Sequence, residues 1–576
     1  MENPELAAAF DEVADLLELE EANPFRVRAY RNAARTIRDL PVPAAEIARS
    51  SEQRLEDLQG IGEDLAGKIQ TLLKTGDLPL RQELRGRLPS GLRDLLEVAG
   101  LGPKRARILY QQLGISSLES LREAAESHRI RGIKGFGAKT EENIIRELQH
   151  VSKEERRFYL ADAKVYADAL LRHLRATPGV NAAEMAGSYR RCKETVGDLD
   201  LLVTCQVAGS VMDRLAAYEG VAEVLARGGT KMTVRLKIGI QVDLRVVPQE
   251  SYGAALQYFT GSKAHNIILR RMAQEKGLKI NEYGVFRGKR RIAGRTEEQV
   301  YATLGLPYIP PELREARGEI ELAMEHRLPH LLELDDLRGD LHMHTNVTDG
   351  RASLEAMVLA AKRRGHKYIA ITDHSKRVTM ANGLDARRLR AHWKSIDELA
   401  SRIKGMTVLK GVELDILEDG TLDLPDDVLA EADWVVASIH YGQNQPRERI
   451  TRRLLNAIRS PYVHAIGHPT GRLIGKRKGY DVDLDTVLKA AADYGCMMEL
   501  NSQPSRLDLD DVALIAARER GVSIVINTDA HSTEELALLE FGVYQARRAG
   551  LEAKNVANSR PLAKFRQLLK RQPALA

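Results

Sequence analysis

The centre of this chain is organised by the stretch GSYRRCKETVGDLDLLV, residues 187–203. If residues 199–203 form a strand, side chains alternate between its faces, so Asp198 and Asp200 project from the same face. Asp243 lies in a similar apolar run that a neighbouring strand would bring alongside them. Three clustered carboxylates repel one another unless cations neutralise them, and such ligands suit Mg²⁺ or Mn²⁺. The pattern predicts a site for two ions that carries out phosphoryl or nucleotidyl transfer.

The residues before the acids distinguish this site from an ordinary strand end. A lone Asp-x-Asp is more often a pair of acids facing solvent. Here Gly187 and Ser188 offer backbone N–H groups and a hydroxyl to a phosphate, and Arg190 and Arg191 follow directly. A Gly-Ser pair, an Asp-x-Asp and a third Asp form the pattern of the nucleotidyltransferase superfamily, which this stretch resembles.

Composition sets the limits for the whole chain. It has 576 residues, 43% of them apolar, which predicts several domains with substantial cores. The formal charge of +5 neither requires nor excludes nucleic acid. Cys192, Cys205 and Cys496 form no Cys-x-x-Cys pair, which suits a reducing compartment. There is no basic leader and no run of about 18 apolar residues. We therefore expect a cytoplasmic protein that does not cross a membrane.

A glycine pattern recurs three times within residues 1–150, which otherwise read as helical: Leu58–Gly62, Val98–Gly102 and Ile133–Gly137. The glycines permit a tight hairpin and bring N–H groups to a phosphate at the next helix N-terminus. One copy could be a helix C-cap, but three copies resemble helix-hairpin-helix motifs, which bind the DNA backbone without reading bases. The predicted DNA-binding residues are Gly60, Gly62, Lys68, Gly100, Gly102, Lys104, Gly135 and Gly137.

Further motifs follow the carboxylates in a fixed order. They are Tyr258-Phe259-Thr260-Gly261-Ser262-Lys263-Ala264-His265-Asn266, then Arg270, then Asn281-Glu282-Tyr283-Gly284. Together with the Gly-Ser and the acids, they make residues 1–318 resemble the X-family DNA polymerases, the group that contains DNA polymerase beta. The resemblance implies a nucleotidyltransferase palm with a thumb that selects the nucleotide.

The resemblance also implies roles for single residues. Asp198 and Asp200 would bridge two Mg²⁺ or Mn²⁺ ions, while Asp243 would hold only the catalytic one. The incoming dNTP would contact Gly187, Ser188, Arg191, Tyr258, Phe259, Gly261, Lys263, Asn266 and Arg270. Core packing is the alternative for the two aromatics. Lys263 replaces an acid of the polymerase beta pattern, so a solvated lysine is an equal alternative there.

Lys68 falls at the position of the Schiff-base lysine of the polymerase beta lyase domain. A lyase lysine needs a depressed pKa and a nearby cation that seats the sugar phosphate. Asp64 stands where that family has a lysine. Lyase activity therefore stays open, whereas binding of a 5′-phosphate by Arg26 or a neighbour is easier to defend.

Beyond residue 338, polar residues repeatedly end apolar runs. Examples are Asp340-Leu341-His342-Met343-His344, Ile369-Ala370-Ile371-Thr372-Asp373-His374 and Val435-Val436-Ala437-Ser438-Ile439-His440. Strands that alternate with helices and each end in a ligand predict a parallel barrel with its site at the C-terminal rim. A single histidine at a strand end is usually structural, but six such ends converge here.

The set resembles the PHP family of metal-dependent phosphoesterases, over about residues 338–535. The resemblance implies a distorted (β/α)7 barrel and hydrolysis of phosphoesters. Mixed imidazole and carboxylate ligands suit Mn²⁺, Zn²⁺ or Fe²⁺, and their number is enough for three ions. The loop after His468 carries Arg472, Lys476, Arg477 and Lys478, which would either contact the DNA backbone or be solvated. The expected metal ligands are His342, His344, Asp349, His374, Glu413, His440, His468, Asp529 and His531.

The expected organisation is multidomain, with an all-α helix-hairpin-helix region, an α+β palm with a thumb, and an α/β barrel. We predict a helical lyase-like domain at 1–90, a fingers-like helix-hairpin-helix domain at 91–150, a palm at 151–255, a thumb at 256–318, a linker at 319–338 and a PHP domain at 339–576.

The whole order resembles the bacterial X-family polymerases with a C-terminal PHP domain (PolX). This implies filling of short gaps in base excision repair, a Mn²⁺-dependent 3′–5′ exonuclease, and incision at abasic sites or cleaning of 3′ ends. The expected partners are gapped or nicked duplex DNA with its primer 3′ end and 5′-phosphate, and dNTPs, bound by a monomer. Two alternatives stay open: a PHP phosphomonoesterase acting on a small substrate, and a non-catalytic scaffold for DNA ends.

Overall fold

The chain forms two compact units, residues 1–156 and 157–576. The structure is a computed structural model, and it describes residues 3–20, 22–38, 40, 44–49, 54–58, 60–87, 92, 95, 98, 101, 103–133, 135–151 and 157–569. No helix in these ranges is both long and apolar enough to cross a bilayer.

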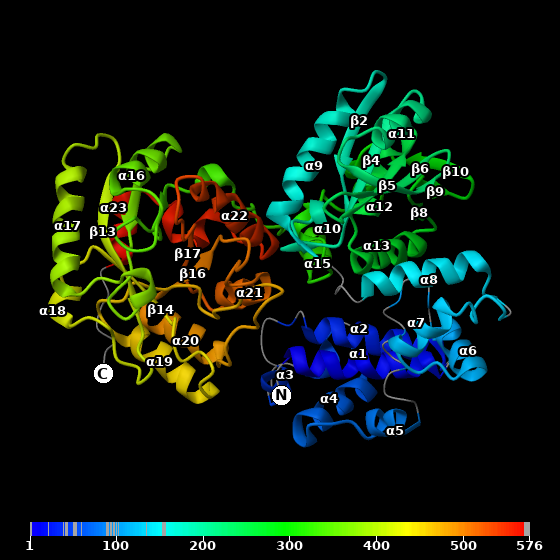
Figure 1. The fold of residues 1–576 in the computed structure, drawn as a ribbon, viewed down its shortest axis with the longest axis horizontal. Helices are drawn as coiled ribbons and strands as arrows, with labels where there is room; N and C mark the ends of the chain where they lie inside the picture. Colours follow the sequence, from blue (N-terminus) through cyan, green and yellow to red (C-terminus); the bar gives the residue numbers. More distant parts are fainter. Residues whose placement is uncertain are drawn as a thin grey trace. The chain divides into compact units, whose positions relative to one another are not determined.

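The first unit is built from helices, as expected for a helix-hairpin-helix region (Figure 1). Its first two helices lie side by side, and Phe10 and Tyr30 pack against each other in the core between them. A second core contains Leu109, Leu121 and Phe136. The helices are α1 (Asn3–Leu19), α2 (Pro24–Arg38), α3 (Ala44–Ile47), α4 (Glu63–Thr75), α5 (Pro79–Arg87), α6 (Pro103–Leu113), α7 (Leu118–Glu126) and α8 (Ala138–Val151).

The second unit begins with a mixed five-stranded sheet in the order β2–β4–β7–β6–β5. Its central pair, β4 and β7, is parallel, and the other neighbours are antiparallel. The strands are β2 (Val180–Met185), β4 (Asp198–Cys205), β5 (Val221–Arg227), β6 (Lys231–Leu236) and β7 (Gln241–Val246), with a small pair β1 (Phe158–Tyr159) and β3 (Thr195–Val196). The helices are α9 (Leu160–Arg175), α10 (Gly187–Arg190) and α11 (Ala208–Ala216).

The alternation predicted for the acidic stretch is present in β4. Leu199 and Leu201 are buried in the core, whereas Asp198 and Asp200 are partly buried on the opposite face. Because hydrophobic burial holds the leucines inward, a shift of one residue would move the acids into the core. A similar alternation of polar and buried apolar residues occurs around Asp243 in β7.

The next region carries a three-stranded antiparallel sheet packed against helices. Ser262 accepts a hydrogen bond from the main-chain N–H of His265, which caps the second helix of this region. The elements are α12 (Tyr252–Thr260), α13 (Lys263–Glu275), β8 (Lys279–Asn281), β9 (Gly284–Arg287), β10 (Arg290–Ala293), α14 (Glu297–Thr303) and α15 (Glu319–Met324).

The last region is a seven-stranded parallel sheet in sequential order, surrounded by helices (Figure 1). A parallel bridge between Met343 and Ala530 brings the two edges together, so the sheet is a nearly closed barrel. The strands are β11 (Gly339–Asp340), β12 (Tyr368–Ile371), β13 (Thr407–Asp415), β14 (Trp434–Ser438), β15 (Ala465–Ile466), β16 (Met497–Asn501) and β17 (Ile524–Asn527). The helices are α16 (Leu354–Arg363), α17 (Ala386–Ala400), α18 (Asp426–Leu429), α19 (Arg447–Arg459), α20 (Leu484–Tyr494), α21 (Asp511–Glu519), α22 (Leu539–Arg548) and α23 (Leu562–Leu568).

The predicted fold class is thus confirmed in its three parts: a helical first region, a mixed sheet with helices, and a parallel barrel. Strand β16 was not among the six segments on which the barrel prediction rested. Its sequence, Met497-Met498-Glu499-Leu500-Asn501, also ends in polar residues, but none is a histidine.

Candidate metal and nucleotide sites

The nine predicted ligands of the barrel lie on or just after the carboxyl ends of its strands. Glu413 is in β13, and the others are in the segments that follow β11, β12, β14, β15 and β17. Because the carboxyl ends of parallel strands meet at one rim, these side chains converge. Two ligands have left-handed backbone conformations, His468 with a φ of 29° and Asp529 with a φ of 52°. Such strained positions are typical of functional sites.

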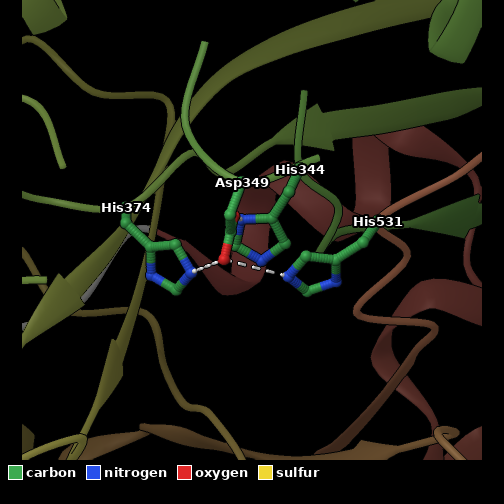
Figure 2. Close-up of side chains that lie close together, drawn as sticks. All are labelled: His344, Asp349, His374 and His531. Atoms are coloured by element: carbon green, nitrogen blue, oxygen red, sulfur yellow. Dashed lines mark ion pairs between the residues drawn. The ribbon is translucent and has the colours of Figure 1, made fainter. Parts of the chain in front are cut away.

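Three groups of potential ligand atoms form in this rim, each with its atoms within 4.8 Å of one another. In the first, Asp349 Oδ2 lies 3.2 Å from His374 Nε2 and 3.4 Å from His531 Nε2, and the His344 ring stacks between the other two imidazoles (Figure 2). The groups are His344, Asp349, His374 and His531; His342, His344 and Asp529; and His374, Glu413 and His440. They include every predicted ligand except His468, whose Nε2 lies 3.0 Å from Glu413 Oε1.

The chemistry of this rim fits metal ions. Buried ring nitrogens of His342 (Nε2), His344 (Nδ1) and His468 (Nδ1) have no hydrogen-bond partner within the described residues. Orphaned buried nitrogens are costly unless something else binds them. Burial alone would raise the pKa of Glu413, but the surrounding imidazoles, His440 first, lower that pKa well below its usual range. An anionic carboxylate surrounded by imidazoles that keep such orphaned ring nitrogens is a suitable donor set for Mn²⁺, Zn²⁺ or Fe²⁺.

Side chains that the sequence analysis did not single out form hydrogen bonds with these predicted ligands. Glu499 in β16 is fully buried, and its Oε1 lies 2.7 Å from His342 Nδ1. Its Oε2 accepts a hydrogen bond from the main-chain N–H of His468 at 2.7 Å. Asn501 donates to Asp529 Oδ2 at 3.0 Å. Partners of this kind fix the ring orientation of metal-binding histidines, and the polar end of the apolar β16 run was the signal that could have found them.

The palm brings its three aspartates together through strand register. Asp200 in β4 lies directly opposite Asp243 in β7, and Asp198 lies opposite Gln241. Asp243 is held by Thr233, which donates to Oδ1 at 2.5 Å, and by Gln241, which donates to Oδ2 at 2.7 Å. The three acids therefore share one face of two adjacent strands.

Burial and mutual repulsion both disfavour the ionised forms of Asp198 and Asp200. Burial and then the charge of Asp243 raise the pKa of Asp198. Burial, Asp198 and Asp243 together raise the pKa of Asp200 to about 7. Carboxylates that repel one another in this way are stabilised when divalent cations bind between them.

Gly187 approaches Asp200 so closely that no side chain fits. Gly187 has a φ of 60°, and a Cβ atom there would lie 2.2 Å from Asp200 Oδ2. Arg191 donates through Nε to Glu315 Oε1 at 3.0 Å and through Nη1 to the main-chain oxygen of Thr260. Arg190 instead pairs with the buried Glu297 at 2.6 Å, so the two arginines have different surroundings.

We expect Gly187→Ala to lower the rate of primer extension by about 100-fold, because a displacement of about 1 Å in a catalytic group can cost that much. The added methyl group must push Asp200 aside and also disfavours the left-handed backbone. Single-turnover extension of a gapped primer measures this rate. Gly209→Ala in α11 is the matched control, since a Cβ atom there meets nothing within 4 Å. Equal rates for Gly187→Ala and the native chain would contradict the site.

The predicted nucleotide contacts of the thumb region surround the end of α12 and the start of α13. The Tyr258 and Phe259 rings pack edge to face at 5.1 Å, and the Arg270 guanidinium lies 5.1 Å from the Tyr258 ring centre. Lys263 is exposed, and Gly261 has a φ of 71°. Asn266 is only 7% exposed: it accepts from Gln257 and donates to the main-chain oxygen of Tyr258. These two bonds use one donor and one acceptor site of the Asn266 amide, which has two of each.

Each of the three glycine patterns of the first unit contains an equivalent main-chain hydrogen bond. The N–H after each first glycine donates three residues back, from Ile61 to Leu58, from Leu101 to Val98 and from Phe136 to Ile133. The middle apolar residue is buried in each copy, with exposures of 3%, 1% and 3%. Gly60 and Gly135 have φ values of 80° and 95°, and Gly62 and Gly137 lead into α4 and α8. Gly100, Gly102 and the side chain of Lys104 lie outside the described residues.

Lys68 pairs with an acid, which makes it less suitable as the nucleophile of a lyase. Its Nζ pairs with Asp64, one helical turn earlier, and lies 5.2 Å from the centre of the Tyr30 ring. Burial alone would lower the pKa of Lys68, but the Asp64 carboxylate raises it overall. A Schiff-base lysine needs the opposite shift.

Arg472, on the loop after His468, forms hydrogen bonds within the protein. It donates to Glu194 Oε2 at 2.6 Å and to the main-chain oxygen of Leu507 at 2.7 Å. Within the same loop, the Ile474 main-chain oxygen accepts from the Tyr159 hydroxyl at 2.9 Å. This part of the loop therefore joins the barrel to the palm.

Known families match four parts of the chain. Residues 1–78 match the helix-hairpin-helix domain, and residues 92–150 match the SAM-like helix-hairpin-helix tandem. Residues 255–315 match the DNA polymerase beta thumb, and residues 340–503 match the PHP domain.

Whole proteins resemble the chain over different lengths. The DNA polymerase/3′-5′ exonuclease PolX of Bacillus subtilis (strain 168) is 40% identical over 576 residues, covering 99% of this chain and 100% of that protein. A probable phosphatase of Thermoanaerobacter sp. (strain X514) is 31% identical over 243 residues, 40% of this chain and 94% of the phosphatase. A probable phosphatase of Caldanaerobacter subterraneus subsp. tengcongensis is 33% identical over 204 residues, 33% of this chain and 75% of the phosphatase.

Proposed function

The chain belongs to the PolX family of DNA polymerase/3′-5′ exonucleases, and from this premise we propose that it fills short gaps in DNA during base excision repair and trims 3′ ends with its barrel. The proposal is supported by two separate clusters of side chains on one chain, three aspartates in the palm and the histidines and acids of the barrel rim. The register of β4 and β7 pairs Asp200 with Asp243, and the barrel rim gathers histidines and acids. Gapped or nicked DNA and dNTPs are the proposed substrates, and the cytoplasm is the proposed location of a monomeric protein.

In the palm, Asp198, Asp200 and Asp243 would hold two Mg²⁺ or Mn²⁺ ions. Bound there, these ions would stabilise charge on the α-phosphate and on the attacking 3′-oxygen of the primer. Ser188 and Arg191 would bind the triphosphate, with Gly187 allowing close approach. Tyr258, Phe259 and Gly261 would line the sugar, Asn266 would reach the base, and Lys263 and Arg270 would flank the nucleotide and template. The close contact of Gly187 with Asp200 supports this arrangement.

In the barrel, the nine ligands would hold up to three ions of Mn²⁺, Zn²⁺ or Fe²⁺. Such ions activate water and stabilise charge on a phosphodiester. Glu499 and Asn501 would keep the ligands in place. The hairpins at Gly60–Gly62 and Gly135–Gly137 would grip the DNA backbone, so that a primer end is presented without regard to sequence.

The phosphatase relatives favour a second candidate, removal of terminal phosphates from 3′ ends or from a small substrate. A primer that ends in a 3′-phosphate separates these possibilities from exonuclease action. Release of inorganic phosphate without shortening indicates end cleaning, whereas release of nucleotides indicates exonuclease. An abasic site in the same duplex tests incision.

Metal binding can be measured directly. We expect Mn²⁺ to raise the melting temperature of chelator-treated protein, because a ligand at 100 times its Kd stabilises the fold by about 2.7 kcal/mol. Isothermal titration calorimetry should detect ions bound at the barrel in the native chain and fewer ions in His344→Ala, since His344 belongs to two of the three ligand groups. Unchanged heats and melting temperatures in both proteins would leave the scaffold as the better account.

A further inference from the structure

A buried cluster of charged side chains joins the barrel to the palm at the end of α22. Arg548, the last residue of that helix, has a side chain only 3% exposed. Its Nη1 donates to the main-chain oxygen of Arg191 at 2.7 Å and to Glu315 Oε1 at 3.0 Å. Its Nη2 donates to Asp511 Oδ2 at 2.6 Å. A residue of the barrel therefore bonds directly to the arginine segment that follows α10.

Arg191 lies between this cluster and the nucleotide site. Its Nε shares Glu315 Oε1 with Arg548, and its Nη1 reaches the main chain of Thr260. A Cβ atom on Gly261 would lie 3.2 Å from Arg191 Nη1, so the guanidinium rests against the loop between α12 and α13. The positive charge of Arg191 also acts on Asp200.

Glu315 is the anion that both arginines share. Burial alone would raise its pKa, but Arg548 first, then Arg191, Lys193 and Arg317, lower that pKa to about 2. If Arg548 were removed, Glu315 would draw Arg191 more strongly, and the Arg191 main chain would lose its donor. Both changes would turn the Arg191 guanidinium away from a bound triphosphate. Charge-assisted hydrogen bonds between them depend strongly on this orientation.

We propose that Arg548 is a positioning residue for nucleotide binding: it holds Glu315 and the Arg191 main chain so that the Arg191 guanidinium can bind the triphosphate of the incoming dNTP. This inference rests on the proposed function, which assigns Arg191 to the triphosphate. The barrel then supports the polymerase reaction through one side chain that lies outside the palm and thumb.

The test uses the full chain and steady-state filling of a one-nucleotide gap. We expect Arg548→Ala to raise the KM for dNTP by about 10-fold, as for loss of a hydrogen bond to a charged group, while kcat and the exonuclease rate keep their native values. Arg548→Lys keeps the charge and should give an intermediate KM. The matched control is Arg547→Ala, because Arg547 spans the same boundary but pairs with Glu312 and the main chain of Leu332.

Three results would overturn the inference. The first is a native KM in Arg548→Ala. The second is an equal rise in Arg547→Ala, which would mean that the boundary is merely loosened. The third is a native KM for dNTP in Arg548→Lys, which decides the matter if Arg548→Ala melts below the assay temperature. A native chain that extends no primer would instead contradict the proposed function, so the two failures are distinguishable.

Discussion

The variant that combines Asp198→Ala with Asp200→Ala is expected to lose gap filling by about 10³-fold or more while it still shortens primers at the native rate. A bound cation contributes several kcal/mol to a phosphoryl-transfer transition state, and each 1.36 kcal/mol is a factor of ten in rate. These two acids face the same side of β4, and Asp200 also faces Asp243, so their removal leaves no carboxylate pair to hold ions. Extension of a labelled primer on a one-nucleotide gap measures the effect.

A stability measurement separates this effect from misfolding. The pKa of Asp200 is raised to about 7 by burial first and then by Asp198 and Asp243, so above that pH its ionised form destabilises the folded chain relative to the unfolded one. We therefore expect the double variant to melt at a higher temperature than the native chain at pH 8 in chelator. Asp213→Asn is the matched control, because Asp213 is 70% exposed on the palm and pairs with Arg227. Loss of extension in this control would count against the assignment.

The variant His344→Ala is expected to show the reverse pattern, with exonuclease activity lowered by about 10³-fold and gap filling at the native rate. His344 is fully buried and belongs to two ligand groups, so its loss disturbs more than one ion position. The two imidazole rings on either side of it, His374 and His531, would also lose their stacking partner. Shortening of a labelled primer without dNTPs, in Mn²⁺, is the measurement.

His366→Ala is the matched control for this experiment. His366 is also a largely buried histidine of the barrel, but it precedes β12 and so lies at the end of the strands opposite the ligand rim. In such barrels the rim at the carboxyl ends carries the chemistry and the other end serves stability. Exonuclease loss of the same size in His366→Ala would show that any buried histidine is required, which contradicts the assigned site.

Local pattern was enough to predict the parts of the structure that depend on alternation and strand ends. The Asp-x-Asp acids alternate with buried leucines as expected, because apolar burial specifies the face of a strand. The barrel histidines could be recognised because each ends an apolar run, and parallel strands bring such ends together. Their individual roles in binding ions, nucleotide and DNA stay predictions.

What the sequence could not show depends on contacts between distant residues. Glu499 supports His342 across 157 positions, and its strand was missed because it ends in Glu and Asn rather than His. On its basic loop, Arg472 is expected either to contact the DNA backbone or to be solvated, yet it pairs with Glu194 in the palm. Arg548 gives no signal in its own helix, since its partners Glu315 and Arg191 are more than 200 residues away. Only the packed structure places these charges together.

The central claim is that one chain carries two independent metal-dependent activities on a primer end. The most direct measurement follows a labelled primer on a one-nucleotide gap in Mn²⁺, with and without dNTPs, for the native chain. The account predicts that the primer lengthens with dNTPs and shortens without them. A native chain that does neither would contradict the enzymatic account and make the non-catalytic DNA-end scaffold the better explanation.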